Sequence, residues 1–328
     1  MTIKRSSKLA KSIAILTCLA ASVATGAAWA QTYPDRTIRI VVGTAPSTPT
    51  DIVSRIIANE LQKTEGWTVI VENKVGAINT IGARDVLQAP ADGYSIFAAS
   101  MPVTAAGALL PNSQIDMVRD FTPIIKASVS YNVLVTKPKL DVSSMKELVE
   151  LLKKNPGKLN YSSGGHGTPA HLVGELFKLQ TKVDVAHVPY QQLPQAIQDL
   201  MGGSNDYMFV TTLPVVDLVA NGNLKALAVT SSKPLPAFKG VPTVGEQGFP
   251  ELAVTDWVGF LMRQGTSPEI VTKMNAAMNK ALQSQAVRET LQRIGADVEG
   301  GTPAEFGAFV AAQVKQWEGV VRSANIKM

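Results

Sequence analysis

The stretch Asn160-Tyr-Ser-Ser-Gly-Gly-His-Gly-Thr-Pro-Ala-His171 decides how the fold is predicted. Its first residues fit a short strand, its three glycines allow a tight turn, and Thr168-Pro169 fits the capped first turn of a helix. Such a turn presents unpaired backbone amides at the positive end of a helix dipole, which suits a carboxylate or phosphate. Because any α/β protein also uses such turns as connectors, the stretch by itself leaves an anion cradle and a plain connector both open.

A second strand-to-helix stretch favours the cradle. Ile38–Val42 predicts an apolar strand, and Thr44-Ala-Pro-Ser-Thr-Pro-Thr-Asp51 leads from it into a helix, with Thr48 as the N-cap and Asp51 in the acidic position of a capping box. Thr302-Pro303 begins a helix as well, so the cap alone is not evidence of a site. The first two stretches share an apolar strand followed by a run of Gly, Ser and Thr.

The N-terminal segment predicts export. Four basic residues precede an apolar run from Ile13 to Ala28, and Ala28-Trp29-Ala30 is a small-x-small cleavage pattern. The run is shorter than the ~20 residues that a membrane span requires, which disfavours an anchor. We therefore expect a signal peptide at residues 1–30, cleavage after Ala30 and a periplasmic location. The one cysteine, Cys18, lies inside this segment, so the mature protein has no disulfide or thiol chemistry.

Net charge and chain length limit the class of partner and predict the number of lobes. Loss of residues 1–30 removes four basic and no acidic residues, which lowers the formal net charge from +5 to +1. No basic block or interleaved aromatic pattern points to nucleic acid as a partner. The remaining residues exceed the usual size of one hydrophobic core, so two lobes are expected.

Short apolar strands alternate with amphipathic helices through most of the chain, which predicts mostly parallel sheets covered on both faces. Two extended runs between Phe121 and Thr136 have no helix between them, so the chain can cross to a second lobe there. A long apolar run, Ala253 to Met262, can carry it back. Two crossing strands of this kind make a hinge, and a ligand between the lobes would close it.

At this point the mature chain resembles the solute receptors of tripartite tricarboxylate transporters, the Bug family of periplasmic binding proteins. The resemblance runs through most of the chain in ordered matches, which are Tyr33-Pro34, Val71-Glu72-Asn73 with Gly76-Ala77, Ala91-Asp92-Gly93-Tyr94, residues 156–161, 164–171, 174–177 and 187–190, Leu224–Thr230 and Val241-Pro242-Thr243.

The resemblance implies an α/β, two-lobed periplasmic binding protein of type II-like form, each lobe a mixed sheet flanked by helices and the two joined by crossing strands. It implies residues 31–130 and 256–328 for lobe 1 and 131–255 for lobe 2. It also implies a monomer without cofactor or metal that binds a small carboxylate (a dicarboxylate, an aromatic acid or an amino acid) and delivers it to the membrane components of a transporter. The implied ligand contacts are Thr44, Ser47, Thr48, Pro49, Thr50, Asp51, Ala77, Ser100, Ser163, Gly164, Gly165, His166, Thr168, Tyr190 and Asp206.

Two places depart from the family pattern. Where relatives usually have Pro-Phe-Pro-Pro-Gly-Gly and one further residue before Thr-Asp, this chain has Gly43-Thr-Ala-Pro-Ser-Thr-Pro49 before Thr50-Asp51, which offers more hydroxyls and fewer free amides. The basic-glycine pair usual after Val-Pro-Tyr is replaced by Gln191-Gln192. These differences bear on which acid fits and on the part Tyr190 plays.

Two other classes of function stay open at this stage. A secreted enzyme acting on a small carboxylate could use His166, His171 or His187 as a base, but no nucleophile elbow, phosphate-binding loop or paired-histidine metal helix is present. His166 and His171 lie five residues apart across a helix start, which is poor spacing for a metal site. The effector domain of a transcription regulator shares the lobed form, but the signal peptide argues against it.

Overall fold

The computed structural model describes residues 33–326. The predicted signal peptide therefore lies outside the described residues. The chain from Arg36 onward forms one compact unit, to which Tyr33–Asp35 do not belong. Within it, no described helix combines the length and the apolar character that a membrane crossing needs.

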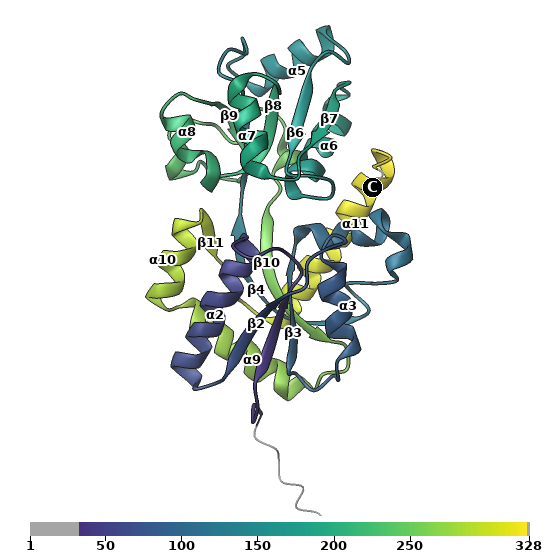
Figure 1. Ribbon diagram of the computed structural model, residues 1–328, viewed down its shortest axis with the longest axis vertical. Coiled ribbons are helices and arrows are strands. Elements are labelled where there is room, and N and C mark those ends of the chain that lie inside the picture. Colours follow the sequence, from purple (N-terminus) through teal and green to yellow (C-terminus); the bar gives the residue numbers. More distant parts are fainter. Residues whose placement is uncertain (1–32, 327–328) are drawn as a thin grey trace, which may run out of the picture. The chain divides into compact units, whose positions relative to one another are not determined.

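Two mixed sheets organise this unit (Figure 1). The six-stranded sheet has the order β11-β4-β10-β3-β1-β2. The five-stranded sheet has the order β7-β6-β8-β5-β9. The strands are β1 (Ile38–Val42), β2 (Val69–Asn73), β3 (Ser95–Ser100), β4 (Phe121–Ser130), β5 (Asn132–Thr136), β6 (Asn160–Ser163), β7 (Ala186–Pro189), β8 (Tyr207–Thr211), β9 (Lys225–Val229), β10 (Asp256–Arg263) and β11 (Ala296–Val298).

Each sheet contains parallel and antiparallel pairs. In the first, β1 lies parallel to β2 and β3, whereas β10 runs antiparallel to β3 and β4. In the second, β6 lies parallel to β7 and β8, whereas β5 runs antiparallel to β8 and β9. The prediction of an α/β fold with two mixed sheets is confirmed. The expectation of mostly parallel sheets is wrong, because the crossing strands β5 and β10 pair antiparallel with both of their neighbours.

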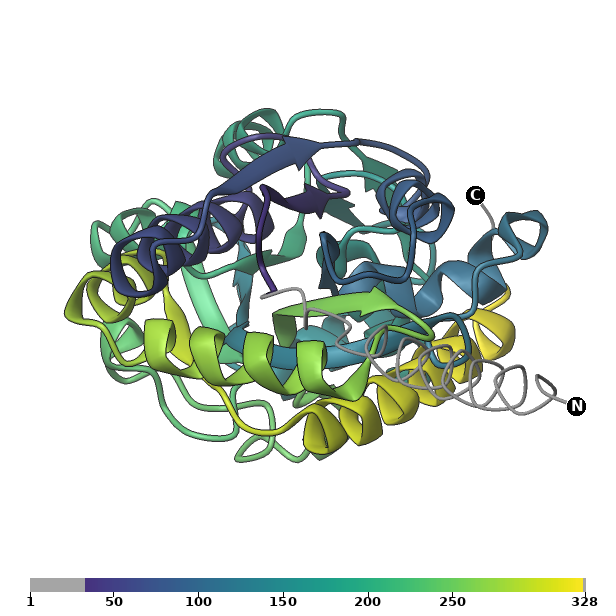
Figure 2. The same cartoon turned by 90° about the horizontal axis from the view of Figure 1, so that it is seen from below.

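Helices cover these sheets and explain why the central strands are almost wholly apolar. On the first sheet, α9 packs between α2 and α11 (Figure 2). Side chains of β1 such as Ile38 and Ile40 are fully buried. The helices are α2 (Pro49–Glu65), α3 (Thr80–Gln88), α4 (Ala106–Leu109), α5 (Met145–Lys154), α6 (Pro169–Thr181), α7 (Leu193–Gly202), α8 (Val216–Ala220), α9 (Pro268–Leu282), α10 (Gln285–Arg293) and α11 (Pro303–Ser323), with the short 3-10 helices η1 (Met101–Ala105), η2 (Pro111–Ser113), η3 (Leu213–Val215), η4 (Pro236–Phe238) and η5 (Pro250–Leu252).

The chain passes between the two sheets at adjoining places. β4 of the first sheet ends at Ser130, and β5 of the second begins at Asn132. The return begins with Asp256 at the start of β10, directly opposite Ser130 in the antiparallel ladder. Polar residues at the ends of these strands are therefore brought together where the chain crosses.

Candidate functional site

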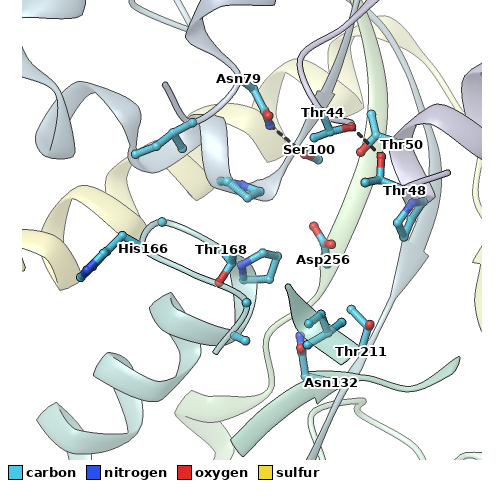
Figure 3. Close-up of a pocket in the computed structure, with 18 of the residues that line it drawn as sticks. Thr44, Thr48, Thr50, Asn79, Ser100, Asn132, His166, Thr168, Thr211 and Asp256 are labelled. Atoms are coloured by element: carbon cyan, nitrogen blue, oxygen red, sulfur yellow. Dashed lines mark hydrogen bonds between the residues drawn. The ribbon is translucent and has the colours of Figure 1, made fainter. Parts of the chain in front are cut away.

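A cavity of about 490 Å3 lies where the two sheets meet (Figure 3). On the side of the first sheet it is lined by the loop after β1, the loop before α3 and the end of β3. On the side of the second sheet it is lined by the loop between β6 and α6 and by the end of β8. In open α/β sheets, ligands bind outside the carboxyl ends of the strands, and this cavity has that position.

Four helix N-caps line the cavity. They are Thr48 before α2, Asn79 before α3, Ser100 before η1 and Thr168 before α6. Each helix start directs backbone amides and the positive end of its dipole toward its cap, and such ends attract anions. None of the described residues that line the cavity is a lysine or an arginine. An anion here would be held by uncharged donors.

The start of α2 differs from the predicted capping box. The side chain of Thr48 accepts no bond from the helix amides. Its hydroxyl instead donates to the carbonyl of Ala45 at 2.8 Å and lies 2.7 Å from the hydroxyl of Thr44. The carboxylate of Asp51 accepts the backbone N–H of Ser47, one residue before the predicted partner. The capping-box prediction is therefore wrong, and the first turn of α2 points at the cavity without a side-chain cap.

The carboxylate of Asp51 stabilises this loop through hydrogen bonds. It is 3% exposed and binds Arg55 as well as the side-chain amide of Asn73, which also donates to the carbonyl of Thr44 at 3.0 Å. Burial by itself would raise the pKa of Asp51, but the hydrogen bonds from Arg55, Asn73 and Ser47 outweigh it and lower the pKa. The ionised carboxylate of Asp51 thus serves to stabilise the loop.

The loop between β6 and α6 is folded tightly on itself. Gly165 and Gly167 have φ angles of 116° and 73°, which favour glycine. The hydroxyl of Thr168 donates to the carbonyl of Gly165 at 2.7 Å and accepts the backbone N–H of His171 at 3.4 Å, so Thr168 caps α6 as predicted. The predicted strand, turn and helix start are all present.

All three histidines of the chain meet at this loop. One ligand atom from each of His166, His171 and His187 lies within 4.8 Å of the others, a convergence that the spacing argument missed because His187 comes from β7. The rings of His171 and His187 stack with centroids 4.3 Å apart. Burial lowers the pKa of His171 to about 4 and of His187 to about 3, so both are neutral at pH 7.

This cluster is poorly arranged to hold a metal. Nδ1 of His171 accepts the backbone N–H of Gly167 at 3.0 Å, so the proton of the neutral ring sits on its Nε2. A metal would have to displace that hydrogen bond or that proton. Nε2 of His187 is also engaged, at 2.7 Å from the hydroxyl of Ser163. The stack instead supports the shape of the Gly165–Thr168 turn.

Two polar residues at the crossing strands were missed by the sequence argument. Asp256 and Asn132 both line the cavity and are 9% and 1% exposed. Figure 3 shows Asp256 between the Thr44–Thr50 loop and the strand ends that carry Asn132 and Thr211. Each opens a strand whose next residues are apolar, and a polar residue at the start of such a run is the signal that could have identified it.

Of the predicted ligand contacts, nine line the cavity. They are Thr44, Thr48, Pro49, Thr50, Ala77, Ser100, Gly164, His166 and Thr168. The cavity also takes in residues outside the prediction, namely Ile78, Asn79, Pro102, Asn132, Gly167, Pro169, Ala170, Leu193, Val210, Thr211 and Asp256. Six of these additions lie within two residues of a predicted contact in the sequence, but Asn132, Leu193, Val210, Thr211 and Asp256 come from other segments.

Asp206 and Tyr190 are not among the residues that line the cavity. Asp206 precedes β8, whereas Thr211 at the other end of that strand faces the cavity, and five strand residues span about 17 Å. The carboxylate of Asp206 pairs with Lys137 at 2.6 Å. The hydroxyl of Tyr190 is directed to Asp199 at 2.7 Å. Neither side chain is therefore kept among the ligand contacts.

Four further predicted contacts also lie outside the lining. Ser47 and Asp51 bind each other, as described above, and Ser47 is exposed. The hydroxyl of Ser163 is fully buried and bonded to Gly165 and His187. Gly165 contributes the carbonyl that Thr168 binds. These four residues form the framework of the two loops.

Sequence comparison places the chain among known proteins. A profile described as "Tripartite tricarboxylate transporter family receptor" matches residues 53–326. Protein BugT of Bordetella pertussis is 34% identical over 301 residues, which cover 91% of this chain and 92% of BugT.

Solved structures agree with the sequence match. Rpa4515 of R. palustris, solved with adipate, is 30% identical with a TM-score of 0.78, over 90% of this chain and 99% of that one. MatC of Rhodopseudomonas palustris, solved with bound malate, is 31% identical with a TM-score of 0.76, over 88% of this chain and 100% of that one.

Proposed function

Because the chain belongs to the tripartite tricarboxylate transporter receptor family, we propose that it is a periplasmic receptor that closes on a small carboxylate in the cavity between its sheets. The observation that carries the proposal is that the N-termini of α2 and α6, from opposite sheets, open on the same cavity. The carboxylate oxygens would accept hydrogen bonds from the amides and hydroxyls of these two loops.

The family consists of non-enzymatic binding receptors, so the alternative of a secreted enzyme is set aside. We take residues 131–255 as the second lobe and the flanking segments, up to 130 and from 256, as the first. The ligand contacts that we propose are the cavity-lining members of the predicted set, above all Thr44, Thr48, Gly164 and Thr168.

Two finer statements belong to the same proposal. Membership of this receptor family supports delivery of the carboxylate to the membrane components of a transporter. Export with cleavage after Ala30 would yield a mature chain that begins at Gln31. Intact mass spectrometry of protein from the periplasm tests the second statement, and a mass that retains residues 1–30 would contradict it.

The experiment that tests the binding proposal compares acids with their uncharged derivatives. Calorimetry would titrate the protein with adipate, malate and 3-phenylpropanoate and with the methyl ester of each. An ester cannot accept bonds as an anion, so donors of the closed site stay unpaired at about 1–3 kcal/mol each, which corresponds to at least about a fivefold loss of affinity. Equal affinities for acid and ester would contradict the proposal.

A further inference from the structure

The cavity carries a negative charge near its centre. Asp256 is the one carboxylate among the described residues that line it, and no lysine or arginine there offsets that charge. Oδ1 of Asp256 accepts the backbone N–H of Trp257 at 2.9 Å, and the backbone N–H of Met101 also donates to this carboxylate. An ionised carboxylate has about four acceptor positions, so Asp256 keeps capacity for a further donor.

The charge state of Asp256 at pH 7 also favours a ligand that carries a hydrogen-bond donor. Burial raises its pKa to about 6, against the opposing effect of the two backbone amides. The group is therefore mainly ionised at pH 7. A ligand that presented only carboxylates would bring like charges together beside this buried carboxylate, where repulsion is strong.

Asn132 is a second polar side chain in the cavity that can bind a polar group of a ligand. Its side chain is 1% exposed and lines the same cavity, yet neither Oδ1 nor Nδ2 has a hydrogen-bond partner within the described chain. Buried side-chain amides nearly always have hydrogen-bond partners, so we expect the amide of Asn132 to bind a polar group of the ligand. Asp256 pairs with Ser130 in the ladder of β10 and β4, and Asn132 follows two residues later, which brings both groups to the same part of the cavity.

We infer that the site takes a carboxylate that also bears an ammonium group, such as an α-amino acid, with the ammonium held by the carboxylate of Asp256 and by Oδ1 of Asn132. This inference rests on the proposed function, which supplies the cradle for the carboxylate. The ammonium offsets the charge of Asp256 and provides the donors that its free acceptor positions and Asn132 lack. Ile78, Leu193 and Val210 offer apolar lining for the remainder of the ligand.

Matched ligand pairs test the inference in the wild-type protein. Calorimetry would compare leucine with 4-methylpentanoate, phenylalanine with 3-phenylpropanoate, and glutamate with glutarate, since the members of each pair differ in the amino group. We expect the amino member of at least one pair to bind about tenfold or more tightly than its partner, because a hydrogen bond to a charged group is one of the stronger kinds.

The variant Asp256→Asn should abolish this preference, and the plain acid should bind as well as or better than to wild type. Asp217→Asn is the matched control, because Asp217 is exposed on α8 and absent from the cavity lining, and it should keep the preference. Thermal melts verify that each variant is folded. If Asp256→Asn does not fold, the ligand pairs on wild type still decide the question.

The outcomes separate this inference from the function on which it rests. Plain acids that bind as tightly as or more tightly than every amino partner overturn the ammonium subsite and leave the carboxylate receptor intact. Failure of both members of every pair to bind, together with failure of adipate and malate, overturns the proposed function itself. A preference for amino acids that persists in Asp256→Asn excludes Asp256 as its source and overturns the assignment.

Discussion

Gly167, in the loop between β6 and α6, lies against Ile78 from the opposite side of the cavity. Its φ is 73°, and a Cβ there would lie 3.0 Å from Cδ1 and Cγ1 of Ile78. Gly66 has nearly the same φ, 70°, but a Cβ there would meet no atom within 4 Å. The two glycines thus share a backbone requirement and differ in surroundings.

Alanine at either position should destabilise the protein by about 1 kcal/mol, because a side chain disfavours positive φ. Only Gly167→Ala should also weaken carboxylate binding, since its methyl group occupies the space between the loop and Ile78. Thermal melts and calorimetry with adipate and leucine measure the two effects. Unchanged affinity in Gly167→Ala would place the ligand away from this loop.

At this scale the sequence predicted loops better than side chains. Thr44, Thr48 and Thr168 line the cavity because each stands next to a helix start that local sequence reveals. Asp206 does not line the cavity, and no local pattern tells which end of its strand faces it. Asp256 lies far along the chain from both loops, so only the folded sheet brings it to them.

The N-cap of helix α11 can be compared directly with the N-cap of α2. Thr302 makes a complete capping box with Glu305, whereas Thr48 makes no cap bond and instead braces its own loop through Ala45 and Thr44. The same residue type thus stabilises a helix in one place and shapes a candidate site in the other.

Thr302→Ala should cost about 1 kcal/mol of stability, the typical loss of an N-cap, and leave ligand affinity unchanged. Thr48→Ala should cost less stability as a cap and weaken carboxylate binding, because it removes a hydroxyl that lines the cavity. Chemical denaturation and calorimetry on both variants provide the comparison. Loss of binding in a folded Thr302→Ala protein, with normal binding in Thr48→Ala, would reverse the assignment.

The sequence predicted the longer elements because their periodicity and caps are local. The strand at residues 38–42 and the start of α11 after Thr302 agree with it closely. The prediction missed β11, which has three residues and is a strand only because it pairs with β4. It also missed α7, which begins at Leu193-Pro194 without a side-chain cap.

The two-sheet arrangement of the molecule could be predicted from the alternation of strands with helices. It could also be predicted from two uninterrupted apolar runs that pass between the sheets. The histidine stack could not be predicted, because its members come from a loop, a helix and a strand whose separation in sequence carries no sign of contact. That stack gives the molecule a dependence on pH which no single element would have.

Stability should decline as the pH falls from about 7 to about 5, the range in which an unfolded histidine takes up its proton. Folded His171 and His187 have pKa values lowered to about 4 and about 3, so in this range the unfolded chain binds more protons and unfolding is favoured. Well below pH 6.5 each histidine contributes a slope of about 1.4 kcal/mol per pH unit. The slope should persist until the pH approaches the folded pKa values.

Asp256 acts in the opposite direction, because its pKa is raised to about 6 in the folded protein and protonation between about pH 6 and pH 4 favours that state. Two histidines outweigh one aspartate, so the net slope remains destabilising toward acid. His187→Gln, which keeps a partner for Ser163 without a titrating ring, should flatten the decline, and Asp256→Asn should steepen it. The exposed His166, replaced by Gln, is the control for a histidine of the same cluster outside the His171–His187 stack. Thermal melts across this range would contradict the account if His187→Gln lost stability toward acid as steeply as wild type, since the buried stack would then not be the group that takes up protons on unfolding.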